Sequence, residues 1–245
     1  MNPLKRAVAG VLRLAGWELV KARPSGGPGA GTMESALRWL APRHPVRTVL
    51  DVGASNGSWT ELAMQCYPDA AFLLVEAQRD AHEPALRALA GRYPNVHYVI
   101  AAAGDRDGTV HFDGSDPFGG AASEHPTGAH DIVVPMTTID GEVKRRGLEP
   151  PFLLKLDTHG FEVPIFEGAR NVLSQAGLVV VEAYNFELTP GTLRFHEMCT
   201  FLETRGLRCV DLVDVMRRPE DGALWQFDLM FVPRDRPEFR SNSYR

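Results

Sequence analysis

Short apolar runs alternate with helical patterns along most of this chain, and this alternation constrains its fold more than any other feature. The runs are rich in Val, Leu, Ile and Phe and apolar on both faces, which is typical of buried parallel strands. They cover Arg47–Val52, Ala71–Val75, Val96–Ala101, Phe152–Leu156 and Leu178–Val181. Helical patterns lie near Thr32–Leu40, Ser58–Tyr67, His82–Arg92, Thr138–Arg146 and Glu162–Ser174. This order predicts a doubly wound α/β fold, with a mainly parallel sheet and helices on both faces.

The C-terminal part departs from the alternation. After a helix near Thr192–Arg205, two apolar runs, Leu207–Val213 and Phe227–Val232, flank a turn-rich stretch. This pattern predicts an antiparallel hairpin. A second irregular segment, Asp113–His130, contains several Gly and two Pro, and we expect it to form a loop over a site.

The N-terminal residues form a separate unit in the sequence. Pro3–Val20 has the pattern of an amphipathic helix in a cationic arm, and the Gly/Pro-rich stretch Pro24–Gly31 is typical of a flexible joint. We expect an arm and joint at 1–31, a main domain at 32–235 and a tail at 236–245. We favour docking of the arm on its own domain, or on a second copy in a homodimer, over contact of the arm with an anionic membrane.

Charge and cysteine content narrow the function classes. The net charge of −5 provides no cationic field, so nucleic acid is not an expected partner. Three cysteines without a C-x-x-C pair fit neither a disulfide framework nor a cysteine zinc site, which favours a cytoplasmic location. The apolar stretch Ala7–Leu12 is too short to span a membrane, and we expect no stable insertion.

The stretch VLDVGASNGSWT, from Val49 to Thr60, runs from a strand through a glycine turn into a helix. Ligands of open α/β sheets bind at such turns. Counting from Gly53, two of the three glycines of a dinucleotide fingerprint are missing, and a phosphate-loop lysine is also lacking. A carboxylate at Asp51 would repel a pyrophosphate but attract positive charge, and S-adenosylmethionine carries an ammonium and a sulfonium.

The next two strand ends extend the same site. Glu76, 23 residues after Gly53, is placed to accept hydrogen bonds from ribose hydroxyls. Small residues at Ala101–Gly108 leave room for adenine, with Asp105 near its amine. The alternative to cofactor binding is that Asp51 only caps the turn and that Glu76 is only a solvated residue at a strand end. The predicted cofactor residues are Asp51, Gly53, Ala54, Asn56, Gly57, Thr60, Glu76, Ala77, Ala102 and Asp157.

Titratable side chains gather after the fourth and fifth strands. Asp157 and His159 follow the fourth strand, and Glu182 ends the fifth. A hydroxyl that attacks a sulfonium methyl group needs a nearby base, so these three are the catalytic candidates. The alternative makes Asp157 a helix cap and His159 an exposed loop residue. Asp157 and Glu182 together would suit Mg²⁺, but magnesium cages usually need more oxygen ligands, so no metal ligand is predicted.

Several motifs in order resemble the FkbM-type methyltransferase family, within the class I S-adenosylmethionine-dependent fold. They are DVGASNGSWT, VEA, VPMTTID, LLKLDTHGFEVPIFEGA, VVVEAYN and FDLMFVP, and they extend from about Val46 to Pro233. The resemblance implies a seven-stranded sheet with an antiparallel last strand. It also implies O-methylation of a hydroxyl on a small molecule, sugar, glycan or secondary metabolite. By this resemblance Asp51, Gly53, Asn56, Gly57 and Glu76 would hold the cofactor, with Asp157 and His159 near the acceptor.

One position departs from the family pattern. The family often has D-x-E-G-x-E after the fourth strand, whereas His159 stands here in place of the first glutamate. The base therefore stays open among His159, Asp157 and Glu182. A scaffold that retains the fold only to bind a partner is the alternative to an enzyme.

Overall fold

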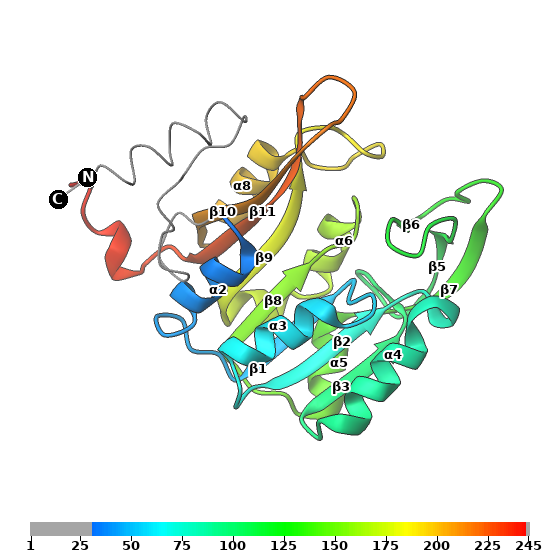
Figure 1. The fold of residues 1–245 in the computed structure, drawn as a ribbon, viewed down its shortest axis with the longest axis horizontal. Helices are drawn as coiled ribbons and strands as arrows, with labels where there is room; N and C mark the ends of the chain where they lie inside the picture. Colours follow the sequence, from blue (N-terminus) through cyan, green and yellow to red (C-terminus); the bar gives the residue numbers. More distant parts are fainter. Residues whose placement is uncertain (1–30, 244–245) are drawn as a thin grey trace, which may run out of the picture.

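The computed structural model describes residues 31–243 and places a seven-stranded sheet at the centre of the main domain (Figure 1). Its strand order is β10-β11-β9-β8-β1-β2-β3. These strands are β1 (Thr48–Val52), β2 (Ala71–Glu76), β3 (Val96–Ile100), β8 (Phe152–Leu156), β9 (Ala176–Tyr184), β10 (Leu207–Arg217) and β11 (Leu224–Pro233). The first five are parallel, and β11 pairs antiparallel with both β9 and β10. The predicted fold class and C-terminal hairpin are confirmed.

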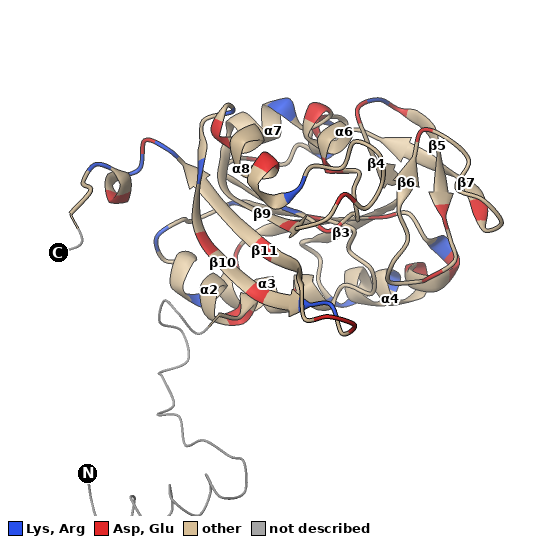
Figure 2. Ribbon diagram, turned by 90° about the horizontal axis from the view of Figure 1, so that it is seen from above, with Lys and Arg blue, Asp and Glu red and all other residues tan. Residues whose placement is uncertain are grey.

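Helices cover both faces of this sheet (Figure 2). One face carries α2 (Met33–Leu40), α3 (Ser58–Cys66) and α4 (Arg79–Arg92). The other carries α5 (Ile139–Arg146), α6 (Glu162–Glu167), α7 (Arg170–Ser174) and α8 (Phe195–Glu203). Each face has its own apolar core, because strand side chains alternate between the faces. The short helix η1 (Pro237–Phe239) follows the last strand.

A second sheet of four strands stands beside the main one and was not predicted. Its order is β4-β7-β5-β6. Its strands are β4 (Ala102–Ala103), β5 (Gly108–Asp113), β6 (Ala122–Ser123) and β7 (Asp131–Thr137). The expectation of an entirely irregular 113–130 segment was therefore wrong at β6. This strand has only two residues and is defined by its pairing with β5, which no local pattern reveals.

The predicted single helix at 162–174 is also wrong, because α6 and α7 are separated at Gly168 and Ala169. A Cβ atom on Gly168 would lie 1.9 Å from the carbonyl oxygen of Gly104. The chain therefore packs directly against the backbone that follows β4. This contact ties the helical layer to the start of the second sheet.

Thr32 caps α2 as predicted, because its Oγ1 accepts a hydrogen bond from the Ser35 amide. The arm and nearly all of the joint lie outside the described residues, so the predicted domain division stays a prediction. No helix within residues 31–243 has the length and apolar character needed to cross a membrane.

Candidate active site

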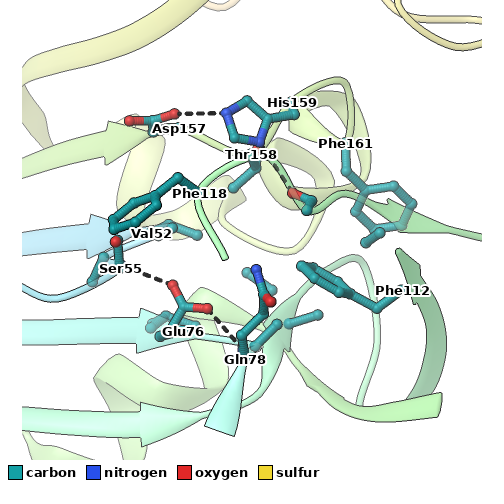
Figure 3. A pocket seen from close by; sticks show the side chains of 18 of the residues that line it. Val52, Ser55, Glu76, Gln78, Phe112, Phe118, Asp157, Thr158, His159 and Phe161 are labelled. Atoms are coloured by element: carbon teal, nitrogen blue, oxygen red, sulfur yellow. Dashed lines mark hydrogen bonds and ion pairs between the residues drawn. The ribbon is translucent and has the colours of Figure 1, made fainter. Parts of the chain in front are cut away.

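A cavity of about 960 Å³, counting space open to solvent, lies at the carboxyl ends of β1, β2 and β8. Its walls come from both sheets, since Val52 and Val75 belong to the main sheet and Phe112 and Ala122 to the second. In the view of Figure 3, Asp157 and His159 lie on one side of the cavity, and Glu76 and Gln78 lie on the other.

The turn between β1 and α3 forms one wall. Gly53 has a φ of 74°, and a Cβ atom there would lie 1.9 Å from the carbonyl oxygen of Asp157. Glycine is thus required both by the backbone angle and by the close approach. Ala54 and Asn56 line the cavity from the same turn, and Asn56 accepts a hydrogen bond from the Ser58 amide through Oδ1.

Glu76 ends β2, and only 6% of its surface is exposed. Its two carboxylate oxygens accept hydrogen bonds from the backbone amides of Ser55, at 2.8 Å, and Gln78, at 2.7 Å. These bonds fix the carboxylate at the cavity wall. Each oxygen keeps a further lone pair for a ligand hydroxyl.

Two buried polar atoms in the cavity wall have no hydrogen-bond partner among residues 31–243. They are Oγ of Ser55 and Nε1 of Trp59. Buried polar atoms are nearly always paired, so unpaired ones in a cavity wall indicate that a polar ligand completes them.

The segment between β5 and β7 forms a roof over the cavity, as predicted for 113–130. Gln78 Nε2 donates to the carbonyl oxygens of Asp116 and Pro117, at 3.0 and 3.1 Å. His82 Nε2 donates to the Pro117 carbonyl at 2.7 Å. The ring of Phe118 packs 5.6 Å from the His82 ring. These contacts anchor the roof to the start of α4.

Asp51 is held in the protein interior. Its fully buried carboxylate does not line the cavity, because it accepts a hydrogen bond from Thr60 Oγ1 at 2.6 Å and pairs with Lys155 Nζ at 3.2 Å. Strand register sets Asp51 beside Lys155. Its charge is therefore balanced inside the protein and does not face a ligand. Thr60 and Gly57 likewise lie outside the cavity lining.

The three catalytic candidates come together. His159 Nε2 lies 3.4 Å from Asp157 Oδ1 and 3.5 Å from Glu182 Oε2. Its Nδ1 lies 3.0 Å from the carbonyl oxygen of Gly120, which can only accept, so Nδ1 carries the proton. His159 adopts a φ of 52°, which directs the loop after β8 toward the cavity. Asp157 and His159 line the cavity, and Glu182 lies behind them.

Burial and charge set the protonation of this region. Burial disfavours the Lys155 ammonium, but the carboxylates of Asp51 and Asp157 outweigh it and raise the pKa of Lys155 above its usual value. Burial also opposes ionisation of Asp157, yet Lys155 lowers the pKa of that carboxyl. Burial and the charge of Asp157 raise the pKa of Glu182 to about 8, and the same two causes raise the pKa of Asp228 to about 7.

The cavity therefore contains most of the predicted residues. Those that line it are Gly53, Ala54, Asn56, Glu76, Ala77, Ala102, Asp157 and His159. Asp105 does not line it, because its side chain pairs with Arg106 at the surface. Lining residues that were not assigned include Ser55, Trp59, Gln78, Phe112, Phe118 and Phe161. Gln78 could have been found from its place directly after the second strand, whereas Phe112 enters from the unpredicted sheet.

The sequence matches one known protein family. A family model described as the methyltransferase FkbM domain matches residues 51–209, more than half of the chain. A search of curated proteins finds no match.

Among solved structures, this chain is similar to methyltransferase FkbM from Methylobacillus flagellatus KT. The identity is 16% and the TM-score 0.49, over 75% of this chain and 43% of that one, so this chain spans less than half of its length. Precorrin-6y C5,15-methyltransferase from Geobacter metallireducens GS-15 has 14% identity and a TM-score of 0.43, over 81% and 86% of the two chains. N-methyltransferase NodS from Bradyrhizobium japonicum WM9 has 10% identity and a TM-score of 0.46, over 82% and 93%.

Proposed function

The chain belongs to the methyltransferase FkbM family, and from this membership we propose that it transfers a methyl group from S-adenosylmethionine to a hydroxyl group. The acceptor class we propose is a sugar, a glycan or a secondary metabolite. S-adenosylmethionine supplies an electrophilic methyl group on a sulfonium when it is bound.

The observation that carries this proposal is the Glu76 carboxylate, held at the cavity wall by two backbone amides. A carboxylate fixed in this way suits the two hydroxyls of a ribose. The small residues Ala77 and Ala102 leave space beside it for a flat ring, and Phe112 provides an aromatic wall. The unpaired Ser55 Oγ and Trp59 Nε1 offer further polar contacts. The residues therefore fit the cofactor.

Asp157, His159 and Glu182 form the acceptor end in this proposal. Asp157 and His159 lie across the cavity from Glu76 (Figure 3), and Glu182 Oε2 lies 3.5 Å from His159 Nε2. There they would orient the acceptor hydroxyl and accept its proton. Replacing His159 by Ala is expected to lower turnover with little change in cofactor affinity.

Calorimetry with S-adenosylhomocysteine tests the cofactor assignment, with NADH as the control ligand. We expect the wild type to bind S-adenosylhomocysteine and Glu76→Ala to bind it about 10-fold or more weakly, because hydrogen bonds to a charged group are lost. Glu61→Ala is the matched control, since Glu61 pairs with Arg92 on the surface of α3. Equal affinity in Glu76→Ala, or a folded wild type that does not bind, would contradict the proposal. Binding without transfer to any acceptor would indicate a scaffold.

A further inference from the structure

Three donor atoms converge at the edge of the cavity, from Asp157, His159 and Glu182. We propose that they bind one divalent transition-metal ion, which holds the acceptor hydroxyl. The role of the ion in catalysis rests on the proposed function, whereas the site itself depends only on these side chains. The carboxylates of Asp157 and Glu182 alone are too few ligands for a divalent ion. In the structure, the imidazole of His159 lies beside them as a third ligand.

The spacing of the donors suits such an ion. One ligand atom from each residue lies within 4.8 Å of the others, and Nε2 of His159 is 3.4 and 3.5 Å from the two carboxylate oxygens. Metal–ligand bonds of about 2.1 Å place neighbouring donors roughly 3 Å apart. Small side-chain adjustments would therefore complete the coordination.

The orientation of the His159 ring suits a metal ligand. Its Nδ1–H donates a hydrogen bond to the Gly120 carbonyl, so Nε2 is the ring nitrogen that faces the carboxylate oxygens of Asp157 and Glu182. A backbone carbonyl that accepts from the second ring nitrogen is the usual support of a metal-binding histidine.

The interactions of the two carboxylates leave one oxygen of each able to bind the ion. Asp157 Oδ2 pairs with Lys155 Nζ at 3.2 Å, so Oδ1 remains for the ion. Glu182 accepts hydrogen bonds from Gln226 Nε2 on one oxygen and from the Tyr184 hydroxyl on the other. An oxygen has two lone pairs, so Oε2 can still bind metal. Each ligand is thus oriented by a hydrogen bond or ion pair with a residue outside the cluster, as is usual for metal ligands in proteins.

The local charge also favours a cation. Lys155 is shared between Asp51 and Asp157, and within residues 31–243 no Lys or Arg forms an ion pair with Glu182. Asp228, opposite Glu182 in the β9–β11 register, adds a further carboxyl. The imidazole favours a transition metal such as Zn²⁺, and the two carboxylates also suit Mn²⁺. Three protein ligands leave open positions for a hydroxyl, whose proton the ion would make easier to remove.

The test is a titration of the metal-free 245-residue chain with Mn²⁺. Binding is measured by the loss of the electron paramagnetic resonance signal of free Mn²⁺ and, separately, by calorimetry. We expect one ion per chain in the wild type and binding weaker by at least about 100-fold in His159→Gln. Tyr184→Phe keeps all three ligands, and we expect a loss of roughly 10-fold. The matched control is His111→Gln, because His111 forms a similar pair with Asp131, at 2.8 Å, outside this cluster.

Binding of S-adenosylhomocysteine is measured on the same samples, which separates the two proposals. Absence of Mn²⁺ binding in a wild type that binds S-adenosylhomocysteine would overturn the metal site and leave the function. Equal Mn²⁺ affinity in wild type and His159→Gln would also overturn it, and would indicate an adventitious ion only. Loss of Mn²⁺ binding in His159→Gln, with S-adenosylhomocysteine binding retained, would support it. Mn²⁺ binding without any cofactor binding would support the metal site and contradict the function.

Discussion

The missing side chain at Gly53 lets the turn after β1 touch the backbone that follows β8. The carbonyl oxygen of Asp157 occupies the space that a Cβ atom would need. This contact holds the turn that lines the cavity beside Glu76 against the segment that contains Asp157 and His159. One residue therefore sets the distance between two groups of functional side chains.

Gly53→Ala is expected to lower the free energy of unfolding by about 3 kcal/mol or more, because it adds a backbone clash to an unfavourable φ. Urea denaturation measures this change. Gly91→Ala in α4 is the control, since nothing lies within 4 Å of its added Cβ, and it is expected to stabilise by about 0.5–1 kcal/mol. Similar unfolding free energies for the two variants would contradict the argument.

Lys155 connects the two parts of the site by a buried charge. Its ammonium contacts Asp51, Asp157 and the Gly53 carbonyl and lies 5.5 Å from the Trp59 ring centroid. Removing it would leave a buried carboxylate without a counter-ion. Lys155 lines the cavity, and the buried Asp51 supports it through this ion pair.

Lys155→Met is expected to reduce the free energy of unfolding by about 3–5 kcal/mol, and adding Asp51→Asn is expected to restore part of it. Urea denaturation of both variants measures the coupling. Arg47→Met is the control, because its pair with Glu149 is exposed at both ends and contributes about 1 kcal/mol or less. A Lys155→Met effect no larger than this control would show that the buried pair is not coupled.

At the scale of elements, the strands of the seven-stranded sheet could be predicted and those of the second sheet could not. Phe152–Leu156 is apolar throughout and buried at every position, so composition alone identifies it. In β7 the exposed Val133 and the buried Val134 give no alternation of polarity, and Pro135 argues against a strand. β7 exists because β5 pairs with it. Partners distant in sequence, and not local propensity, define the second sheet.

The candidate site divides in the same way. Residues at strand ends, such as Glu76 and Asp157, could be predicted because parallel strands end at one edge. The partner of Asp51 could not, because it depends on the register between β1 and β8. Gln226 also needed the structure, since β11 brings it to Glu182 from the C-terminal hairpin.

The roof depends on a few hydrogen bonds from α4 and its preceding residue. Gln78→Ala removes two of them, so we expect faster hydrogen exchange at residues 114–121 and weaker S-adenosylhomocysteine binding by roughly 3–10-fold. Mass spectrometry of deuterium uptake and calorimetry measure these effects. Gln65→Ala is the control, because within residues 31–243 the Gln65 side chain bonds only to Arg38, on the exposed surface. Unchanged exchange in the roof would show that other contacts hold it.

At the scale of the whole molecule, one cavity joins two sheets. Main-sheet residues such as Val52 and second-sheet residues such as Phe112 face the same space. A ligand there contacts both, and it stabilises whichever part would otherwise open first. A bound ligand would therefore couple the two sheets, so that they unfold together.

We therefore expect the protein to unfold in a single transition when S-adenosylhomocysteine is bound, and at a higher melting temperature than without it. At a ligand concentration 100-fold above the dissociation constant, stabilisation of about 2.7 kcal/mol corresponds to a shift of roughly 5–10 °C. Differential scanning calorimetry measures it, with Glu76→Ala as the control. A separate transition that does not shift would mean that one sheet unfolds independently of the cavity.

The pairing pattern of the second sheet has a consequence for protein engineering. Its four strands form a ladder of their own, separate from the seven-stranded sheet, and the roof is the connection between β5 and β7. Exchanging the roof segment therefore leaves every strand pairing of the larger sheet in place. The roof of the cavity could thus be exchanged by loop grafting, as antibody loops are exchanged on a constant framework, while Glu76 and the glycine turn remain untouched.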